Sequence, residues 1–485
     1  MVQTVLDIPI LRWGRTYESL ETSELRDYET GAVVARMSLA NAGLVRRDLR
    51  FADRASHALR AIEPESLYER LERAGELFLR ETLGLGQPDH GALSPQQYVA
   101  LQSATTGLPE VLCRQNMEKV AFVLRHLRTI IESLCGGVPL AWLREGYGQD
   151  RTGLIVSYQL QSPVLGAVLP NNSPGVHTLW LPALPLSAGV VLKPGSQEPW
   201  TPFRVSAALI AAGLPPEALA LYPGDHDVAD AVLGGCGRAL VFGGSATVER
   251  YRANPTVQVH GPGFSKILIG QDCVDRWETY LDLMAESVLS NGGRSCINCS
   301  GIWVPHHGRA IAEALAERLA RIEVRDRTDP QAILAAFTNA QMARQINALI
   351  EAGLQEPGVE DLTARYRREP RLVDRSSYAY LLPTVVYCPS PECKLANQEF
   401  LFPFVSVVEC PQEQVLARIG PTLVCTAITY DASFRRQLLD CTAIDRLNLG
   451  PIPTHRVDWR QPHEGNLVRF LYKHRALQLA DESGK

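Results

Sequence analysis

The chain has 485 residues, which is long for a single hydrophobic core and predicts two or three packed units. Hydrophobic residues make up 46% and charged residues 21%, as in a soluble globular protein, and the net charge of −5 argues against a nucleic-acid-binding protein. No apolar run reaches the roughly 18 to 20 residues that span a bilayer, so we expect no membrane partner.

The N-terminus and the cysteines indicate the cellular compartment. The opening segment, MVQTVLDIPILRWGR, has an early acidic residue and no long apolar core, so it does not have the pattern of a signal peptide. Eleven cysteines, an odd number scattered along the chain, are typical of reduced thiols. We therefore expect a cytoplasmic protein.

The N-terminal part of the chain is predicted to be largely helical. It begins with a hairpin-like piece, LRDYETGAVVARMSLAN, and continues with helical patterns to about residue 138. The glycine- and proline-rich segment LGLGQPDHGALSP is predicted to be a loop.

From about residue 163 the chain alternates short apolar runs with helical patterns. The segments SPVLGAVLP, VVLKP, ALALYPG, RALVFGG and KILIG are predicted strands. Between them, HTLWLPALPLSAG, PFRVSAALIAAGLPP and SATVERYRAN are predicted helices. Such alternation predicts a parallel sheet covered on both faces, with ligands outside the carboxyl ends of its strands.

A second alternating region follows and predicts a second α/β unit. Its predicted strands lie in GIWVP, LPTVVYC, FPFVSVVEC and TLVCTAITY. Its predicted helices lie over residues 309–321 and around residues 330–352.

The stretch SNGGRSCINCSG contains Cys296 and Cys299, three residues apart. A structural zinc site needs four ligands, but the chain has no second C-x-x-C, and His306 and His307 stand at no usual ligand spacing, so we expect no metal. A redox dithiol is expected after the first strand of a small domain. Two interpretations remain: one of the cysteines is a nucleophile, or both are simply small buried residues.

Taken in order, short motifs of the chain resemble those of the aldehyde dehydrogenase superfamily. The resemblance extends over about residues 28–475 and is strongest between residues 163 and 301. The motif PNNSP places Asn172 at the family's catalytic asparagine, and GRSC places Cys296 at its nucleophile. The resemblance implies that a Cys296 thiolate adds to an aldehyde, that hydride leaves to a nicotinamide, and that a thioester remains.

The same resemblance implies a site for NAD or NADP. LKPGSQEP matches the cofactor-ribose lysine at Lys193, FGGS matches a phosphate-binding turn at Gly244 and Ser245, and EFLFPFVSV matches the nicotinamide-ribose glutamate at Glu399. Ser196 stands where many NAD-using members carry an acid, so the 2′-phosphate of NADP is admissible. No G-x-G-x-x-G fingerprint is present.

The implied fold is aldehyde dehydrogenase-like, with two doubly wound parallel-sheet domains and a small β oligomerisation element. Residues 1–138 and 162–269 would form the NAD(P)-binding domain, and residues 270–447 the catalytic domain. Residues 139–161 and 448–485 would form an arm and a tail that pair subunits in a homodimer or homotetramer.

One family position departs from the pattern. The family's water-activating glutamate would lie in the segment HGPGFSK, but His260 stands there. Three interpretations stay open: His260 packs locally, it replaces the base, or no water-activating base is needed because a thiol accepts the acyl group. We favour the third, with coenzyme A as co-substrate and an aldehyde or acyl-CoA as substrate. Hydrolytic oxidation and a catalytically silent binding subunit are the alternatives.

Secondary roles are also implied for several neighbouring residues. The backbone N–H of Cys296 and the amide of Asn172 would hold the oxyanion. Cys299 would be a small neighbour in the pocket, and the charge of Arg294 would favour the thiolate or an anionic substrate. Three aromatic side chains are possible pocket neighbours, at Trp180, His177 and Phe402.

Overall fold

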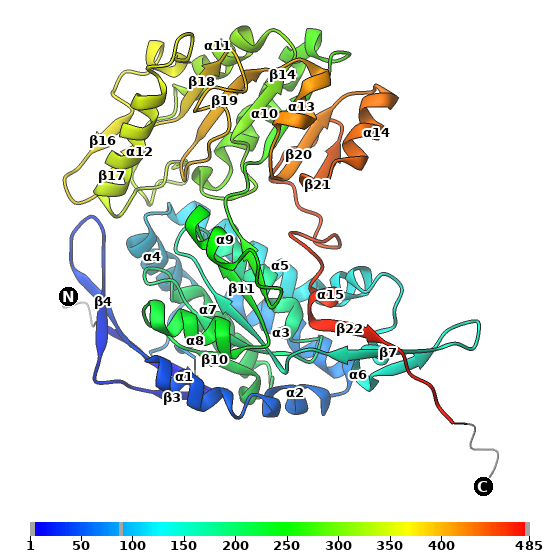
Figure 1. Cartoon of the computed structure of the whole chain (residues 1–485). Helices are drawn as coiled ribbons and strands as arrows, with labels where there is room; N and C mark the ends of the chain where they lie inside the picture. Colours follow the sequence, from blue (N-terminus) through cyan, green and yellow to red (C-terminus); the bar gives the residue numbers. More distant parts are fainter. Residues whose placement is uncertain (1–4, 87–90, 481–485) are drawn as a thin grey trace.

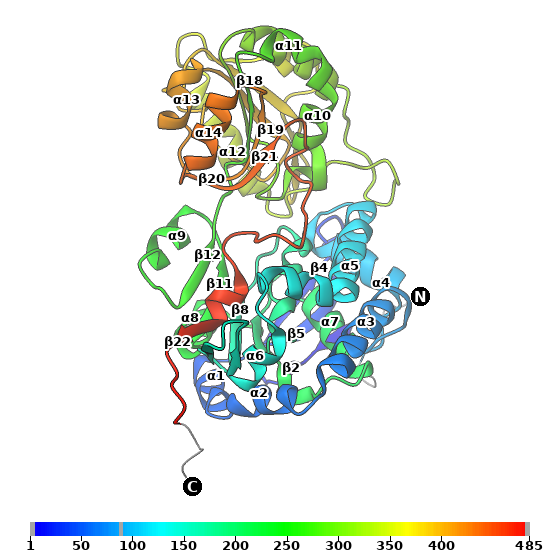
Figure 2. The same cartoon turned by 90° about the vertical axis from the view of Figure 1, so that its right-hand side faces the viewer.

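A computed structural model describes residues 5–86 and 91–480, which fold into two lobes (Figures 1 and 2). Each lobe is built around a seven-stranded sheet, and a small antiparallel sheet projects from one of them. The predicted α/β class with two mostly parallel sheets is confirmed. In the described residues no helix combines the length and the apolar character that a bilayer crossing requires.

The sheet of the first lobe contains the strands β2 (Ile10–Arg12), β3 (Arg15–Tyr17), β8 (Val164–Val168), β9 (Gly189–Lys193), β10 (Leu219–Leu221), β11 (Arg238–Phe242) and β12 (Val257–His260). Their order is β12-β11-β8-β9-β10-β2-β3, and β2 and β3 are antiparallel additions to five parallel strands. Successive residues of β9, Val190 and Val191, enter two different hydrophobic clusters. Both faces of the sheet are therefore buried, which explains its unbroken apolar runs.

The helices of the first lobe are α1 (Ala42–Leu49), α2 (Asp53–Arg60), α3 (Pro64–Arg80), α4 (Pro95–Thr106), α5 (Glu110–Leu134), α6 (Leu140–Glu145), α7 (Trp200–Ala211), α8 (His226–Gly235) and α9 (Ser245–Tyr251). The predicted helical character of the N-terminal part is confirmed. Ser94 caps α4: its hydroxyl accepts the amide N–H of Gln97, whose side chain accepts the N–H of Ser94. The predicted hairpin is formed by β4 (Thr22–Arg26) and β5 (Val33–Ser38), joined by β1 (Leu6–Ile8).

The segment HTLWLPALPLSAG is helical as predicted, but its helices are of the 3-10 type. The segment forms two short 3-10 helices, η1 (Pro174–Leu179) and η2 (Leu181–Ala183). Pro182 and Pro185 lack amide hydrogens, so a regular α-helical hydrogen-bond ladder cannot run through the segment.

The sheet of the second lobe contains the strands β13 (Lys266–Ile269), β14 (Gly301–Val304), β15 (Glu360–Asp361), β18 (Thr384–Cys388), β19 (Phe404–Glu409), β20 (Thr422–Ile428) and β21 (Ile444–Leu449). Its order is β15-β18-β19-β14-β13-β20-β21, and only β15 runs antiparallel to its neighbour. Because β13 pairs with β14 and β20, the change of lobe falls in residues 261–265 and not at residue 269 as predicted.

The remaining elements of the second lobe are η4 (Val274–Tyr280), α10 (Leu281–Leu289), η5 (Ser290–Gly293), α11 (Gly308–Leu319), α12 (Ala340–Gly353), η6 (Leu362–Arg365), β16 (Leu372–Asp374), β17 (Ala379–Leu381), α13 (Gln412–Arg418) and α14 (Ala432–Asp440). The helix predicted around residues 330–352 begins only at Ala340, where the side chain of Asn339 accepts the amide N–H of Gln341.

The chain returns to the first lobe after β21 and ends in the small sheet (Figure 1). Its strands are β6 (Tyr147–Gln149), β7 (Ile155–Leu160) and β22 (Tyr472–Arg475), in the order β22-β7-β6. The helix α15 (Leu467–Leu471) precedes β22, and the buried Tyr472 donates its hydroxyl hydrogen bond to the Leu186 carbonyl oxygen at 2.8 Å. The arm and the tail therefore form one element, and its role in pairing subunits stays a prediction.

Candidate active site

The predicted catalytic residues lie between the two lobes. They stand at the edge of each sheet that faces the other lobe. Asn172 follows β8 and His260 ends β12, so both lie at the carboxyl edge of the first sheet. Cys296 precedes β14, at the amino edge of the second sheet. The side-chain Nδ2 of Asn172 donates a hydrogen bond to the Arg294 carbonyl oxygen at 3.0 Å, and this contact joins the two edges.

Cys296 is held against the loop that connects the lobes. Its carbonyl oxygen accepts a hydrogen bond from the Ser265 hydroxyl at 2.7 Å. A Cβ atom on Gly263 would lie 1.9 Å from the same oxygen, so only glycine allows this approach. The GPG sequence of the loop thus has a local structural reason, independent of any acyl acceptor.

The thiol of Cys296 lines a cavity of about 240 Å³ together with His260. Burial raises the pKa of this thiol well above its usual value, and the charges of Glu464 and Glu399 raise it further. The backbone N–H groups of Cys296 and Ile297 oppose the rise only in part. The thiol is therefore protonated at neutral pH, and its use as a nucleophile requires a base.

His260 has the geometry of an oriented base. Its ring stacks on Phe242 with centroids 4.6 Å apart, and its Nδ1 donates a hydrogen bond to the carboxylate of Glu464. Its Nε2 is buried and has no hydrogen-bond partner among the described residues. A neutral imidazole in this tautomer has a free lone pair on Nε2, and His260 lines the same cavity as Cys296.

Glu464 is a site residue that the sequence analysis missed. It lies in the tail, between β21 and α15, in the segment assigned only to subunit pairing. Its side chain is 17% exposed and lines the same cavity as Cys296. No local pattern marks it, because the pairing with His260 joins residues far apart in the sequence.

Four predicted cofactor residues lie at the carboxyl ends of β9 and β11, which both neighbour β8. Burial lowers the pKa of Lys193, whose ammonium has no hydrogen bond or ion pair among the described residues. Ser196 accepts a weak hydrogen bond from Asn171 at 3.3 Å. Gly244 and Ser245 are exposed at the start of α9, where a Cβ on Gly244 would meet nothing within 4 Å. A cation without a hydrogen bond and an open turn at the carboxyl edge of the same sheet fit a nucleotide, and these contacts stay predictions.

Glu399 lies against the loop between the lobes, and its charge acts on the Cys296 thiol. Its carboxylate accepts the backbone N–H of Gly263 at 3.2 Å and that of Phe264 at 2.6 Å. Burial raises the pKa of Glu399 to about 7, although these two hydrogen bonds act in the opposite direction. The predicted contact of Glu399 with a nicotinamide ribose remains untested.

The predicted role of Arg294 is wrong. Its guanidinium is buried over the Phe337 ring and donates to the carbonyl oxygens of Thr106, at 2.8 Å, and Ala336. The side chain thus ties the end of α4 to the loop before α12, and it does not line the cavity of Cys296. The sequence shows that residue 294 is an arginine, but it does not show the direction in which the side chain points.

The three proposed aromatic neighbours and Cys299 are also outside the cavity. His177 donates from Nε2 to Glu198 at 3.0 Å and accepts the Trp180 indole N–H on Nδ1 at 3.2 Å, within the core. Phe402 packs against other phenylalanines of the second lobe, and Cys299 is buried. The aromatic side chains that line the cavity are Phe242 and Trp459.

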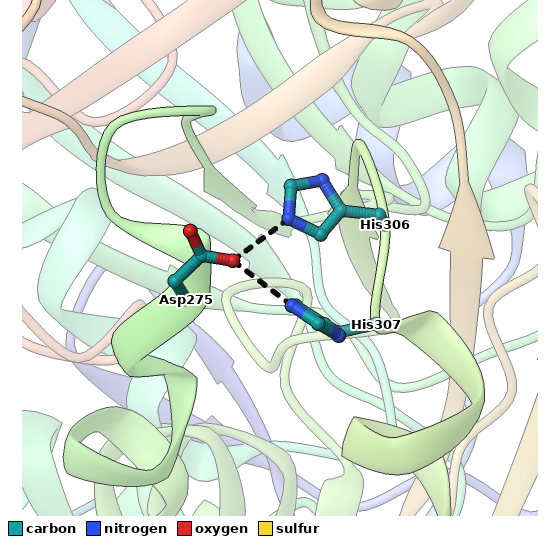
Figure 3. Close-up of side chains that lie close together, drawn as sticks. All are labelled: Asp275, His306 and His307. Carbon is teal, nitrogen blue, oxygen red and sulfur yellow. Dashed lines mark hydrogen bonds and ion pairs between the residues drawn. The ribbon is translucent and has the colours of Figure 1, made fainter.

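One cluster of metal-ligand type lies elsewhere. His306 and His307 each donate a hydrogen bond to the same oxygen of Asp275 at 2.9 Å (Figure 3). Asp275 lies in η4 and both histidines lie between β14 and α11. These side chains are largely exposed and do not line the cavity of Cys296, so we assign them no part in its chemistry.

Comparison with known proteins places this arrangement in a family. The chain is 24% identical over 254 residues to malonate-semialdehyde dehydrogenase 1 of Geobacillus kaustophilus strain HTA426, covering 50% of this chain and 51% of that protein. It is 22% identical over 351 residues to the acylating, mitochondrial methylmalonate-semialdehyde dehydrogenase of Arabidopsis thaliana, covering 65% and 52%. The chain thus spans about half the length of these curated relatives.

Similarity in structure extends over nearly the whole chain. The NAD+ complex of an aldehyde dehydrogenase from Bacillus cereus superposes with a TM-score of 0.75 at 13% identity, covering 97% of this chain and 96% of that chain. The model of the aldehyde dehydrogenase family matches residues 15–419, a range that includes the five parallel strands of the first sheet, β13 to β19 of the second lobe, and Cys296. The chain therefore belongs to the aldehyde dehydrogenase family.

Proposed function

We propose that the protein oxidises an aldehyde to a carboxylic acid with NAD or NADP, through a thioester on Cys296 and with His260 as the base. One observation carries this proposal: Glu464 orients the imidazole of His260, the ring's Nε2 has no partner among the described residues, and His260 and Cys296 line the same cavity. This geometry supports the interpretation of His260 as a substitute base more than the interpretation that it only packs locally.

In the first half of the reaction, Nε2 of His260 takes the proton of the Cys296 thiol. The thiolate sulfur forms a bond to the aldehyde carbon, and the carbonyl π electrons move to oxygen. We assign the holding of that oxyanion to the backbone N–H of Cys296 and to the second N–H of the Asn172 amide, whose first N–H is bound by the Arg294 carbonyl oxygen. Lys193 and Glu399 would hold a nicotinamide cofactor, which would supply the hydride acceptor for this adduct. Loss of hydride from the adduct would leave a thioester on Cys296.

In the second half, water replaces the sulfur. After the first proton has left to solvent, Nε2 of His260 takes a proton from water as its oxygen attacks the thioester carbon. The carbon–sulfur bond breaks, the acid leaves, and the Cys296 sulfur regains a proton. The carboxylate of Glu464 fixes the tautomer of His260 and stabilises the imidazolium in both halves.

Coenzyme A is the second candidate acceptor. It is favoured by the absence of the family's glutamate in HGPGFSK and by similarity to a plant relative whose name describes it as acylating. A thiol with a pKa near 8.5 ionises far more readily than water. The imidazole of His260 is equally suited to take the proton of such a thiol.

Stopped-flow measurement of reduced cofactor separates the two acceptors. Enzyme is mixed with NAD or NADP and an aldehyde panel, with and without coenzyme A. Steady turnover without a thiol is expected if water accepts the acyl group. A burst of about one reduced cofactor per site, followed by a stop that coenzyme A relieves, would instead establish the acylating reaction.

Replacement of His260 tests the base itself. His260→Ala should lower steady turnover by roughly 10²- to 10⁴-fold, the contribution of a positioned general base. Glu464→Gln should lower it in the same direction, because the ring loses its orienting carboxylate. His307→Ala, at an exposed histidine, is the control. Full turnover by His260→Ala would show that the histidine is structural.

A further inference from the structure

The cavity of Cys296 continues to a group of basic side chains that the proposed reaction does not use. Lys119 enters it from α5, and His455 and His463 enter it from the tail after β21. None of the three belongs to a family motif recognised in the sequence. They meet only because the tail crosses from the second lobe to the first over α5 (Figure 2).

Each of these side chains has at least one polar atom without a partner in the described residues. The ammonium of Lys119 has no hydrogen bond or ion pair there, and the Nδ1 atoms of His455 and His463 are buried without a hydrogen-bond partner. His455 is fixed by its Nε2, which lies 3.2 Å from a carboxylate oxygen of Glu286. The nearby carboxylate of Glu464 already accepts from His260. Lys119 and His463 thus face the cavity without a counter-charge of their own among the described residues.

The surroundings lower the pKa values of all three basic groups. Burial lowers the pKa of Lys119. Burial lowers the pKa of His463 to about 3, and the neighbouring His260, Arg446 and Lys119 lower it further. Burial also lowers the pKa of His455, against the opposing effect of Glu286. An anion in the cavity would give the Lys119 ammonium a partner, and the two histidines could donate hydrogen bonds to it.

We propose that the cavity binds aldehydes that carry a carboxylate at the far end of the chain, with Lys119 as the group that pairs with this carboxylate. The proposal rests on the proposed function, because it names the substrate class of the same site. The cavity of about 240 Å³ is smaller than the roughly 300–1,000 Å³ typical of sites for drug-sized ligands. Its apolar lining, at Val176, Leu179 and Val457, suits a short aliphatic chain between the two ends.

The first test is binding, which does not depend on turnover. Succinate and butanoate share one carboxylate and a four-carbon chain, and only succinate has a second carboxylate for Lys119. Titration calorimetry on the full-length protein should show tighter binding of succinate. Lys119→Gln should reduce the preference for succinate by about 10- to 100-fold, the range for a lost charged hydrogen bond. Lys119→Arg should keep part of it.

Lys394→Gln is the matched control, because Lys394 is 77% exposed and pairs with Glu356 on the surface. A thermal melt of each variant checks that the fold is retained. Equal binding of succinate and butanoate by the unchanged protein, or an unchanged preference in a folded Lys119→Gln variant, would overturn the proposal.

The second test uses the reaction. The ratio of kcat/KM for 4-oxobutanoate to that for butanal should fall by about 10- to 100-fold in Lys119→Gln. If neither aldehyde is oxidised, the proposed function fails, while the succinate titration still decides on the anion site. If both aldehydes are oxidised and the ratio does not change, the function stands and the role of Lys119 is excluded.

Discussion

At the scale of single residues, the active site keeps its nucleophile protonated. Cys296 is partly buried at the wall of the cavity, and the carboxylates of Glu464 and Glu399 lie close enough to oppose a negative sulfur. Both effects make the thiolate less stable in the site than in water, so the pKa rises. The nucleophile is therefore used only when a base such as His260 removes its proton beside the substrate.

The raised pKa of the Cys296 thiol predicts how the rate of its alkylation depends on pH. Without substrate or cofactor, the rate of Cys296 modification by iodoacetamide should rise with pH and should still be rising at pH 9, the usual thiol value, because the folded pKa lies above it. Mass spectrometry of the modified peptide follows the reaction. Cys299, buried and with a pKa raised to about 12, serves as the slow reference. A plateau below pH 8 would contradict the raised pKa.

At the scale of elements, residues 261–265 do two things. They carry the chain from β12 in the first sheet to β13 in the second, and they supply the backbone against which Cys296 and Glu399 are placed. The backbone N–H groups of this loop bind the Glu399 carboxylate, and the hydroxyl of Ser265 binds the Cys296 carbonyl. A shift of this loop would therefore move both residues together.

Gly263→Ala is expected to displace the nucleophile. The new Cβ would lie 1.9 Å from the Cys296 carbonyl oxygen, so loop and cysteine must separate. A misplacement of about 1 Å costs on the order of 10²-fold in rate. Steady turnover measures the loss, and a thermal melt measures stability. Gly234→Ala, in α8 with nothing within 4 Å of its Cβ, is the matched control. Equal activity of the two variants would show that the loop tolerates the contact.

At the scale of the whole molecule, the tail runs from the second lobe past the cavity of Cys296 to the small sheet. After β21 it carries His455, His463 and Glu464 to the cavity, and it then ends in the small sheet with β7. Both β22 and β6 are edge strands of that sheet, and Tyr147 and Leu154 are exposed large hydrophobic residues on the arm. Open strand edges with exposed apolar side chains favour association with another chain.

We therefore propose a homodimer or homotetramer formed through the arm and the tail. Light scattering at micromolar concentration should give at least twice the mass of a single chain. Deleting the residues after 471 removes β22 and should lower the mass toward that of one chain. A single-chain mass for the full-length protein would exclude this assembly. Because the deletion leaves Glu464 in place, any activity that remains separates subunit pairing from the base.

Much of the fold could be predicted from the sequence, because its signals are local. Unbroken apolar runs such as those of β8 and β9 indicate strands buried on both faces, and their alternation with helices indicates parallel sheets. The positions of Cys296, Asn172 and Lys193 in short motifs indicated the family and a nucleophile. The identity of a residue within a motif is a property of the chain itself.

The tertiary structure decided how the residues of the site act on one another. The sequence contains His260 and Glu464 but not their contact, which depends on the path of the tail across two lobes. It also contains Arg294 and Lys119 but does not show that the first turns into the core while the second lines the cavity. Side-chain direction and long-range contact arise from packing, whose determinants are distributed over the whole chain.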